Sequence, residues 1–226
     1  MSTEKQQEHY YKEKTKIPLQ LGEVSALIKG RELKLFSSSP VFSWRQIDKG
    51  SLIMAENMLI PEGQGKLLDM GCGYGVLGIF AALQNPLLEV QMVDSSERAV
   101  YLSKKNIRKY GLGSRVTVVQ GDLFEKIEDK DFDTIVSNPP YSAGKDVVEL
   151  LIADSPAYLA EGGTLQIVGR HSKGGKMYRD HIKEAFTYEF EFGKQSGFRI
   201  YLGSKKDIPE LREDKESILE SYSKEE

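Results

Sequence analysis

The tetrapeptide Asn138-Pro139-Pro140-Tyr141, which follows an apolar run of strand character, has residue types that could do chemistry together. The asparagine side-chain oxygen and the Pro139 carbonyl are two hydrogen-bond acceptors. Two acceptors can hold both N–H bonds of a planar amino or amide group and turn the nitrogen lone pair toward an electrophile. The prolines stiffen the loop, and Tyr141 can stack on a flat substrate. The tetrapeptide therefore predicts group transfer to nitrogen, whereas its simpler interpretation is strand termination by proline.

A glycine-rich segment, LLDMGCGYGVLG, is a second candidate binding element. Gly73, Gly75 and Gly78 have the G-x-G-x-x-G spacing, and acidic Asp94 follows about 20 residues later, as in dinucleotide-binding turns. However, the Asp69 carboxylate at the end of the preceding strand would repel a pyrophosphate. It suits a ligand with a cationic amino group, such as S-adenosylmethionine. A glycine turn required only for packing is the third interpretation.

The ends of the next strands offer matching side chains. Asp94 can accept hydrogen bonds from both ribose hydroxyl groups, although it can also be a first-turn acid of the following helix. Asp122 can accept from the adenine amino group, with Leu123 or Phe124 against the ring, or it can cap its loop. The residues predicted to bind S-adenosylmethionine are Asp69, Gly71, Cys72, Gly73, Gly75, Asp94, Ser95, Asp122, Leu123 and Asn138.

The elements that position these residues alternate between strand and helix from Lys66 onward. We expect strands at 66–70, 88–94, 115–122, 132–138 and 162–169, with a closing pair of strands within 187–205. We expect helices at 75–84, 96–111 with a Ser95 cap, 145–154 and 175–186. This order predicts an α/β fold of the Rossmann-like, doubly wound type, with a mostly parallel seven-stranded sheet and an antiparallel edge strand. Ligands bind such sheets at the C-terminal ends of the strands, where the unusual residues fall.

The N-terminal region predicts a small β-hairpin that turns at Lys29-Gly30, followed by an amphipathic helix from about Lys49 to Leu59. We therefore divide the chain into an N-terminal arm with its hairpin, a Rossmann-like domain and a charged C-terminal tail, at residues 1–48, 49–205 and 206–226.

Bulk composition limits the class of protein. A chain of 226 residues supports one sizeable core, and a net charge of -3 means that any nucleic-acid site must be a local basic patch. The single cysteine, Cys72, excludes an intramolecular disulfide, and the three histidines lack metal-ligand spacing, so we expect no metal. No apolar run approaches the roughly 20 residues that span a bilayer, and the N-terminus is too polar for a secretory signal. We expect a cytoplasmic protein without a membrane partner; the oligomeric state stays open.

The quoted motifs resemble the class I S-adenosylmethionine-dependent methyltransferases over residues 40–200. LLDMGCGYG is similar to their first motif, Asp94 to their ribose-binding acid, Asp122 to their adenine-side acid, and NPPY to their amino-group methylation motif. The segments SSPVFSWRQIDKG and NPPYSAGKDVVELL more closely resemble the methyltransferase-small-domain family, which includes rRNA guanine-N2 methyltransferases of the small ribosomal subunit. This resemblance implies methyl transfer to an exocyclic amino group of an RNA base, with guanine N2 of rRNA as the leading expectation.

The chain departs from that family in two ways. The residue after Asn-Pro-Pro is often phenylalanine or another apolar residue in the family, whereas it is Tyr141 here. Bacterial guanine-N2 enzymes carry an additional degenerate N-terminal copy of the domain, and this chain has room for one copy. Methylation of a protein glutamine, as in release-factor enzymes, or of adenine N6 therefore stays an alternative. A dinucleotide-dependent oxidoreductase and a non-enzymatic cofactor-sensing or RNA-binding module are the others.

The expected catalytic residues are Asn138, Pro139, Pro140 and Tyr141, and the expected substrate-binding residues are Phe42, Tyr141, Lys145, Arg170 and Lys173. The family resemblance places Phe42, with Ser43 and Asp48, in a lid or floor beside the cofactor. Simple packing is the other interpretation of Phe42. The lysines and the arginine, together with Lys176, lie near predicted strand ends where they could hold phosphates, or they are ordinary solvated side chains.

Overall fold

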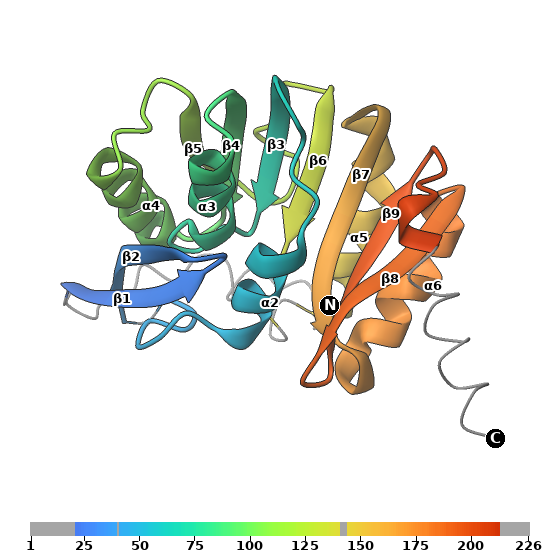
Figure 1. Cartoon of the computed structure of the whole chain (residues 1–226), viewed down its shortest axis with the longest axis horizontal. Coiled ribbons are helices and arrows are strands. Elements are labelled where there is room, and N and C mark those ends of the chain that lie inside the picture. Colours follow the sequence, from blue (N-terminus) through green and yellow to red (C-terminus); the bar gives the residue numbers. More distant parts are fainter. Residues whose placement is uncertain (1–20, 40, 141–143, 213–226) are drawn as a thin grey trace, which may run out of the picture.

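A computed structural model describes residues 21–39, 41–140 and 144–212. Its main sheet contains β3 (Gly65–Met70), β4 (Leu88–Asp94), β5 (Val116–Gln120), β6 (Phe132–Ser137), β7 (Leu159–Arg170), β8 (Tyr188–Gln195) and β9 (Phe198–Ser204). The strand order is β5-β4-β3-β6-β7-β9-β8 (Figure 1). The first five strands are parallel, and β9 runs antiparallel to both of its neighbours. The predicted Rossmann-like, mostly parallel seven-stranded sheet is therefore confirmed.

A short connection makes β8 and β9 neighbours in the sheet. Ser196 and Gly197 both have positive φ, at 52° and 80°, as a tight turn requires. Two strands joined so closely are antiparallel neighbours; β9 is the one that pairs with β7, and β8 lies at the edge.

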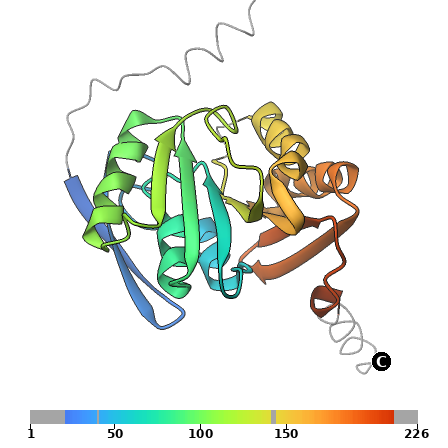
Figure 2. The ribbon, with the colours of Figure 1, turned by 90° about the horizontal axis from the view of Figure 1, so that it is seen from above.

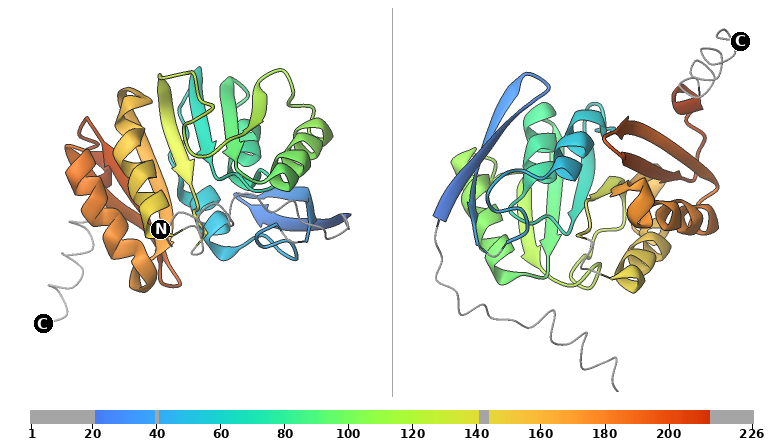
Figure 3. Two further views of the ribbon diagram at one scale, coloured as in Figure 1. Left: turned by 180° about the vertical axis from the view of Figure 1, so that it is seen from behind. Right: turned by 90° about the horizontal axis from the view of Figure 1, so that it is seen from below.

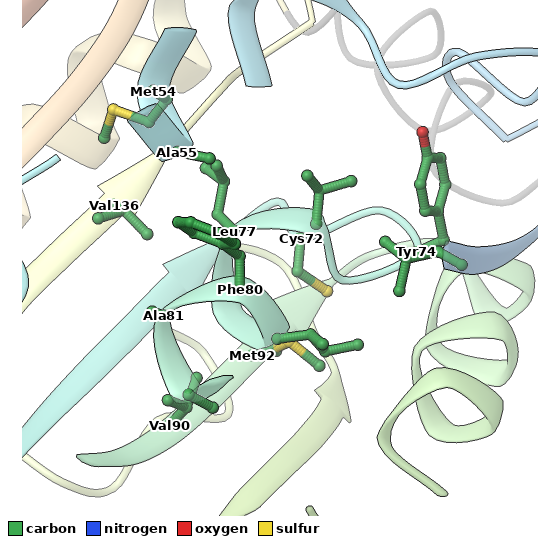
Figure 4. Close-up of a cluster of buried hydrophobic side chains, with 14 of the residues drawn as sticks. Met54, Ala55, Cys72, Tyr74, Leu77, Phe80, Ala81, Val90, Met92 and Val136 are labelled. Atoms are coloured by element: carbon green, nitrogen blue, oxygen red, sulfur yellow. The ribbon is translucent and has the colours of Figure 1, made fainter. Parts of the chain in front are cut away.

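Helices cover both faces of the sheet. One face carries α2 (Lys49–Asn57), α3 (Val76–Gln84) and α4 (Glu97–Lys109); the other carries α5 (Lys145–Asp154) and α6 (Lys176–Ala185) (Figures 1 and 3). Figure 4 shows the core of the first face, where Leu77 and Phe80 of α3 pack near Met54 of α2. Within the described part of the chain, every helix is too short or too polar to cross a membrane.

The N-terminal hairpin, β1 (Leu21–Ile28) and β2 (Arg31–Ser38), forms as predicted and lies along one side of the domain rather than joining the main sheet (Figure 2). Lys29 and Gly30 have φ values of 47° and 75°, which a two-residue turn needs. Its apolar side chains join the same core as α2, α3 and α4.

Buried Asn106 on α4 ties the hairpin to the glycine loop after β3. Its Oδ1 accepts from the Phe36 N–H at 2.7 Å, and its Nδ2 donates to the Phe36 carbonyl at 3.0 Å and to the Tyr74 carbonyl at 2.9 Å. Every polar atom of this side chain is used, as burial requires.

Two predicted boundaries are corrected. Ser96, and not Ser95, caps α4, and its Oγ accepts from the Ala99 N–H at 3.3 Å. The Asp94 side chain accepts from the Ser96 N–H at 2.9 Å. Ser95 therefore belongs to the turn between β4 and α4, and the helix begins one residue later than predicted. Strand β7 begins at Leu159, three residues before the predicted start at Gly162, because Leu159 already pairs with Phe132 of β6.

Candidate active site

A pocket of about 810 Å³ lies at the C-terminal ends of β3, β4, β5 and β6. This is the edge at which doubly wound sheets bind ligands, and the volume suits a nucleoside-sized molecule. Its described lining carries five carboxyl groups and one guanidinium: Asp48, Asp69, Asp94, Glu97, Asp122 and Arg98. Such a lining favours a cationic ligand over a pyrophosphate.

The glycine loop forms one wall of this pocket. Gly71, Gly73 and Gly75 have φ values of 72°, 57° and 92°, a region that other residues adopt only with strain. The loop is closed onto β4, because the Gly71 and Cys72 N–H groups both donate to the Val93 carbonyl at 2.9 Å. The backbone thus leaves open space where a ligand can approach it.

Asp69 is buried at the end of β3 and also lines the pocket. Its Oδ2 accepts from the Gly78 N–H at 2.8 Å, so it anchors the first turn of α3. Burial raises the pKa of this carboxyl to about 7, against the lowering effect of that hydrogen bond and with a further rise from Asp94. Position 78 needs glycine so that α3 can lie this close to the sheet, because a Cβ there would lie 2.6 Å from the Met92 Sδ.

Asp94 uses both carboxylate oxygens to build the site. Its Oδ2 accepts from the Gly73 N–H at 2.8 Å and its Oδ1 from the Ser96 N–H at 2.9 Å. Burial raises the pKa of Asp94, and the two hydrogen bonds oppose the rise. Each oxygen keeps a second lone-pair direction, so two acceptor positions remain for a ligand diol.

Beyond the end of β5, an exposed acid and a partly buried leucine line the pocket. Asp122 and Leu123 both line the pocket, and burial together with Glu125 raises the pKa of Asp122. Phe124, the other predicted ring contact, lies elsewhere. It is buried in the core on the α5 face, with its ring stacked on Tyr158 at a centroid distance of 4.2 Å.

Cys72 and Ser95 also line the pocket. The Cys72 thiol lies 3.8 Å from the Ser103 Oγ, among buried side chains (Figure 4). Burial raises the pKa of this thiol well above its ordinary value, with further rises from Asp94 and Asp69, so it is a poor nucleophile. Ser95 accepts at its carbonyl from the Gln120 Nε2 at 3.0 Å.

Asn138 follows the end of β6 and lines the pocket two strands away from β4, whose end carries Asp94. Its Nδ2 donates to the two Asp48 carboxylate oxygens at 3.0 and 3.2 Å and to the Ser51 Oγ at 2.9 Å. Its Oδ1 receives no hydrogen bond from the described residues, so it is free to accept one. Pro139 and Pro140 line the pocket beside it.

Three further predicted substrate residues, Lys145, Arg170 and Lys173, are not among the described residues that line the pocket. Phe42 is 52% exposed and lines the pocket, and Lys145 is exposed at the first position of α5. Arg170 lies over the Phe198 ring, with 5.0 Å between its Cζ and the ring centroid, and Lys173 is exposed in the turn after β7. Tyr141, predicted to be both catalytic and substrate-binding, falls outside the described residues.

The contact between Asp48 and Asn138 escaped sequence reasoning. A local signal indicates that Asp48 caps α2, because aspartate is a favoured N-cap residue. No sequence spacing indicates that the same carboxylate reaches a side chain 90 residues later.

The polar groups of the pocket fit S-adenosylmethionine. Asp94 offers two acceptors for a ribose diol, and Asp69 is a carboxylate for an amino group. Asp122 is a further acceptor in the pocket lining, next to Leu123. The described residues contain no group of three or more His, Cys, Asp or Glu side chains that could hold a metal ion.

Comparisons with known proteins agree with this geometry. The chain matches the family described as "Methyltransferase small domain" over residues 32–202. It is 33% identical to "Uncharacterized protein YbxB" of Bacillus subtilis, covering 88% of this chain and 98% of that protein. It is 35% identical to "Ribosomal RNA small subunit methyltransferase C" of Vibrio vulnificus, covering 79% of this chain and 51% of that protein.

Among solved structures, the chain resembles a Thermus thermophilus protein described as the 16S rRNA N2 G1207 methyltransferase (RsmC) in complex with AdoMet and guanosine. The TM-score is 0.72 at 25% sequence identity, over 86% of this chain and 53% of the other. The chain therefore spans about half the length of the relatives that carry the rRNA methyltransferase name.

Proposed function

Because the chain belongs to the methyltransferase small domain family, we propose that it is an S-adenosylmethionine-dependent methyltransferase acting on an exocyclic amino group of an RNA base. Guanine N2 of small-subunit ribosomal RNA is the proposed target. The relatives of Vibrio and Thermus support this target by their names and by the guanosine bound to the Thermus protein.

The observation that carries the proposal is the set of hydrogen bonds made by the Asn138 side chain. Its Nδ2 is held by Asp48 and Ser51, so the only unused polar atom of the side chain is an acceptor, beside a pocket that fits S-adenosylmethionine. An amino group attached to an aromatic ring is a weak nucleophile that needs acceptors for its N–H bonds rather than a strong base.

We assign roles as follows. When bound, S-adenosylmethionine supplies an electrophilic methyl group. Asp94 accepts hydrogen bonds from the ribose hydroxyl groups, Asp69 pairs with the ligand's amino group, and Asp122 accepts from the adenine amino group. Asn138 Oδ1 and the Pro139 carbonyl accept from the substrate amino group and stabilise the positive charge that develops on its nitrogen.

The target base must be single-stranded or flipped out of its helix to reach Asn138. Lys145, Arg170 and Lys173 are proposed phosphate contacts around it, with Phe42 and Tyr141 against the base. No carboxylate of the described residues pairs with these three cations, although the whole chain carries a net charge of -3. Because ribosomal RNA is the proposed substrate, we also propose that the protein acts in the cytoplasm.

The first experiment measures binding by calorimetry with S-adenosylmethionine, S-adenosylhomocysteine and NADH, using the natural chain and the Asp94→Ala variant. We expect the two sulfur compounds to bind the natural chain and to bind the variant weakly. Binding of NADH without either sulfur compound would replace the proposal with a dinucleotide enzyme.

The second experiment measures transfer of labelled methyl to small-subunit ribosomal RNA transcribed in vitro, which carries no methyl groups. We expect label in N2-methylguanosine after digestion and mass spectrometry. Label in N6-methyladenosine, or only in a release factor supplied in parallel, would move the assignment to that substrate.

A further inference from the structure

The first turn of α2 holds Asn138 through side chains that do nothing else in the proposed chemistry. Asp48 caps the helix, since its Oδ1 accepts from the Gly50 N–H at 2.9 Å and the Ser51 N–H at 3.1 Å. The same carboxylate accepts from the Asn138 Nδ2. One helix cap is therefore linked directly to the residue proposed to hold the substrate.

Chemistry alone decides which way the Asn138 amide faces. A carboxylate can only accept hydrogen bonds, so the NH₂ group of the amide must face Asp48. Its second N–H donates to the Ser51 Oγ. If the amide turned over, its oxygen would meet the Asp48 carboxylate and its NH₂ group would face the substrate, where it could not accept a hydrogen bond.

Gly50 leaves the space that the amide oxygen occupies. A Cβ at position 50 would lie 3.0 Å from the Asn138 Oδ1 and 3.2 Å from the Phe198 Cε1. The contacts with Asp48 and Ser51 thus select the orientation of the amide, and a side chain at position 50 would crowd its oxygen.

We propose that Asp48 is a positioning residue for methyl transfer, with Ser51 as its helper. Together they lock the Asn138 amide with its oxygen toward the substrate amino group, and the Asp48 charge polarises the amide so that this oxygen becomes a stronger acceptor. The inference rests on the proposed function and adds residues to it that contact neither substrate nor cofactor in this role.

Two substitutions at position 48 separate the capping of α2 from the hydrogen bonds that orient the Asn138 amide. Serine is a good N-cap but is too short to hold the Asn138 amide through two oxygens, so Asp48→Ser keeps the helix and loses the lock. Asparagine keeps the cap and one acceptor oxygen, but it removes the charge and replaces the second carboxylate oxygen with an NH₂ group. Glu56→Ala, at an exposed position of the same helix, is the matched control.

The readout is the methyl-transfer assay with kcat and KM measured separately, alongside S-adenosylmethionine affinity and the thermal midpoint. For Asp48→Ser we expect kcat to fall roughly 10- to 100-fold, the loss of a charge-assisted hydrogen bond, with cofactor affinity and thermal midpoint close to those of the natural chain. For Asp48→Asn we expect a smaller loss, on the order of 3- to 10-fold. Glu56→Ala should match the natural chain.

Other results would overturn the inference. If Asp48→Ser kept the natural kcat, or exceeded it, the contact would be incidental or would restrain Asn138 away from the substrate. If kcat, cofactor affinity and thermal midpoint fell together in both variants, Asp48 would be a structural cap only. A natural chain without methyl transfer is a distinct result, because it counts against the proposed function itself.

Discussion

The two sides of the pocket hold their polar groups by different means. On the proposed cofactor side, Asp69 and Asp94 are fixed by backbone N–H groups, at Gly78 in the first turn of α3, at Gly73 in the glycine loop and at Ser96 before α4. On the substrate side, Asn138 is fixed by side chains that precede it by 87 and 90 residues.

This difference has a physical consequence. Backbone groups on the cofactor side belong to the fold, so a substitution there removes a binding group and also leaves loop N–H groups unpaired. Side chains on the substrate side leave the sheet intact when they change. We therefore expect cofactor-side substitutions to affect binding and stability together, and substrate-side substitutions to affect turnover alone.

The largest effect that tests this difference is expected from Asn138→Ala. Removal of the acceptor should lower kcat by roughly 100- to 1,000-fold, as for loss of a single transition-state hydrogen-bonding group. Affinity for S-adenosylmethionine, measured by calorimetry, should stay within about 2-fold of the natural value, because the side chains assigned to the cofactor in the proposed function, Asp69, Asp94 and Asp122, do not change. A parallel collapse of cofactor affinity would show that the two sides are not separable.

Asp94→Ala should act on both properties at once. It removes two ribose acceptors and leaves the Gly73 and Ser96 N–H groups without their partner. We expect cofactor affinity to fall about 10- to 100-fold and the free energy of unfolding to fall by about 1–3 kcal/mol, by calorimetry and denaturant titration. Unchanged stability would mean that water replaces the carboxylate without cost.

The pH dependence of cofactor affinity should identify Asp69. Its pKa is raised to about 7 by burial, so the empty site binds a proton that a cationic ligand must displace. Affinity should therefore weaken as the pH falls below 7, by up to about tenfold per pH unit, and be steady above it. Asp69→Asn should flatten this dependence; the same slope in that variant would assign it to another group, such as Asp94.

The smallest effect is expected from the proposed phosphate contacts. Arg170→Ala and Lys173→Ala should each raise KM for RNA a few-fold and reduce the salt slope of RNA binding by about one, without a change in kcat. Filter binding across a series of salt concentrations measures this. Equal salt slopes for variants and natural chain would remove these side chains from the RNA interface.

The same difference explains which features of the fold and the site could be predicted from the sequence. Strand-helix alternation and the position of Asp94 follow from local patterns, so the sheet and the acidic side chains that line its C-terminal edge were predictable. The hydrogen bonds that orient Asn138 were not predictable, because no sequence spacing connects Asp48 to a strand end far along the chain. Leu123 and Phe124 stayed alternatives at the sequence level, because the segment between β5 and β6 can present either of two neighbouring apolar side chains; packing against Tyr158 places Phe124 in the core.

Asn106 links the hairpin to the glycine loop, so we expect the order of the hairpin to influence ligand binding. Because this one side chain holds both Phe36 and the carbonyl of Tyr74 in the glycine loop, ordering of the hairpin and ordering of the loop are coupled free energies. Ligand bound at the loop should slow amide hydrogen exchange in β2. A truncated domain that starts at residue 49, the boundary we propose, would lose this coupling and bind its cofactor more weakly.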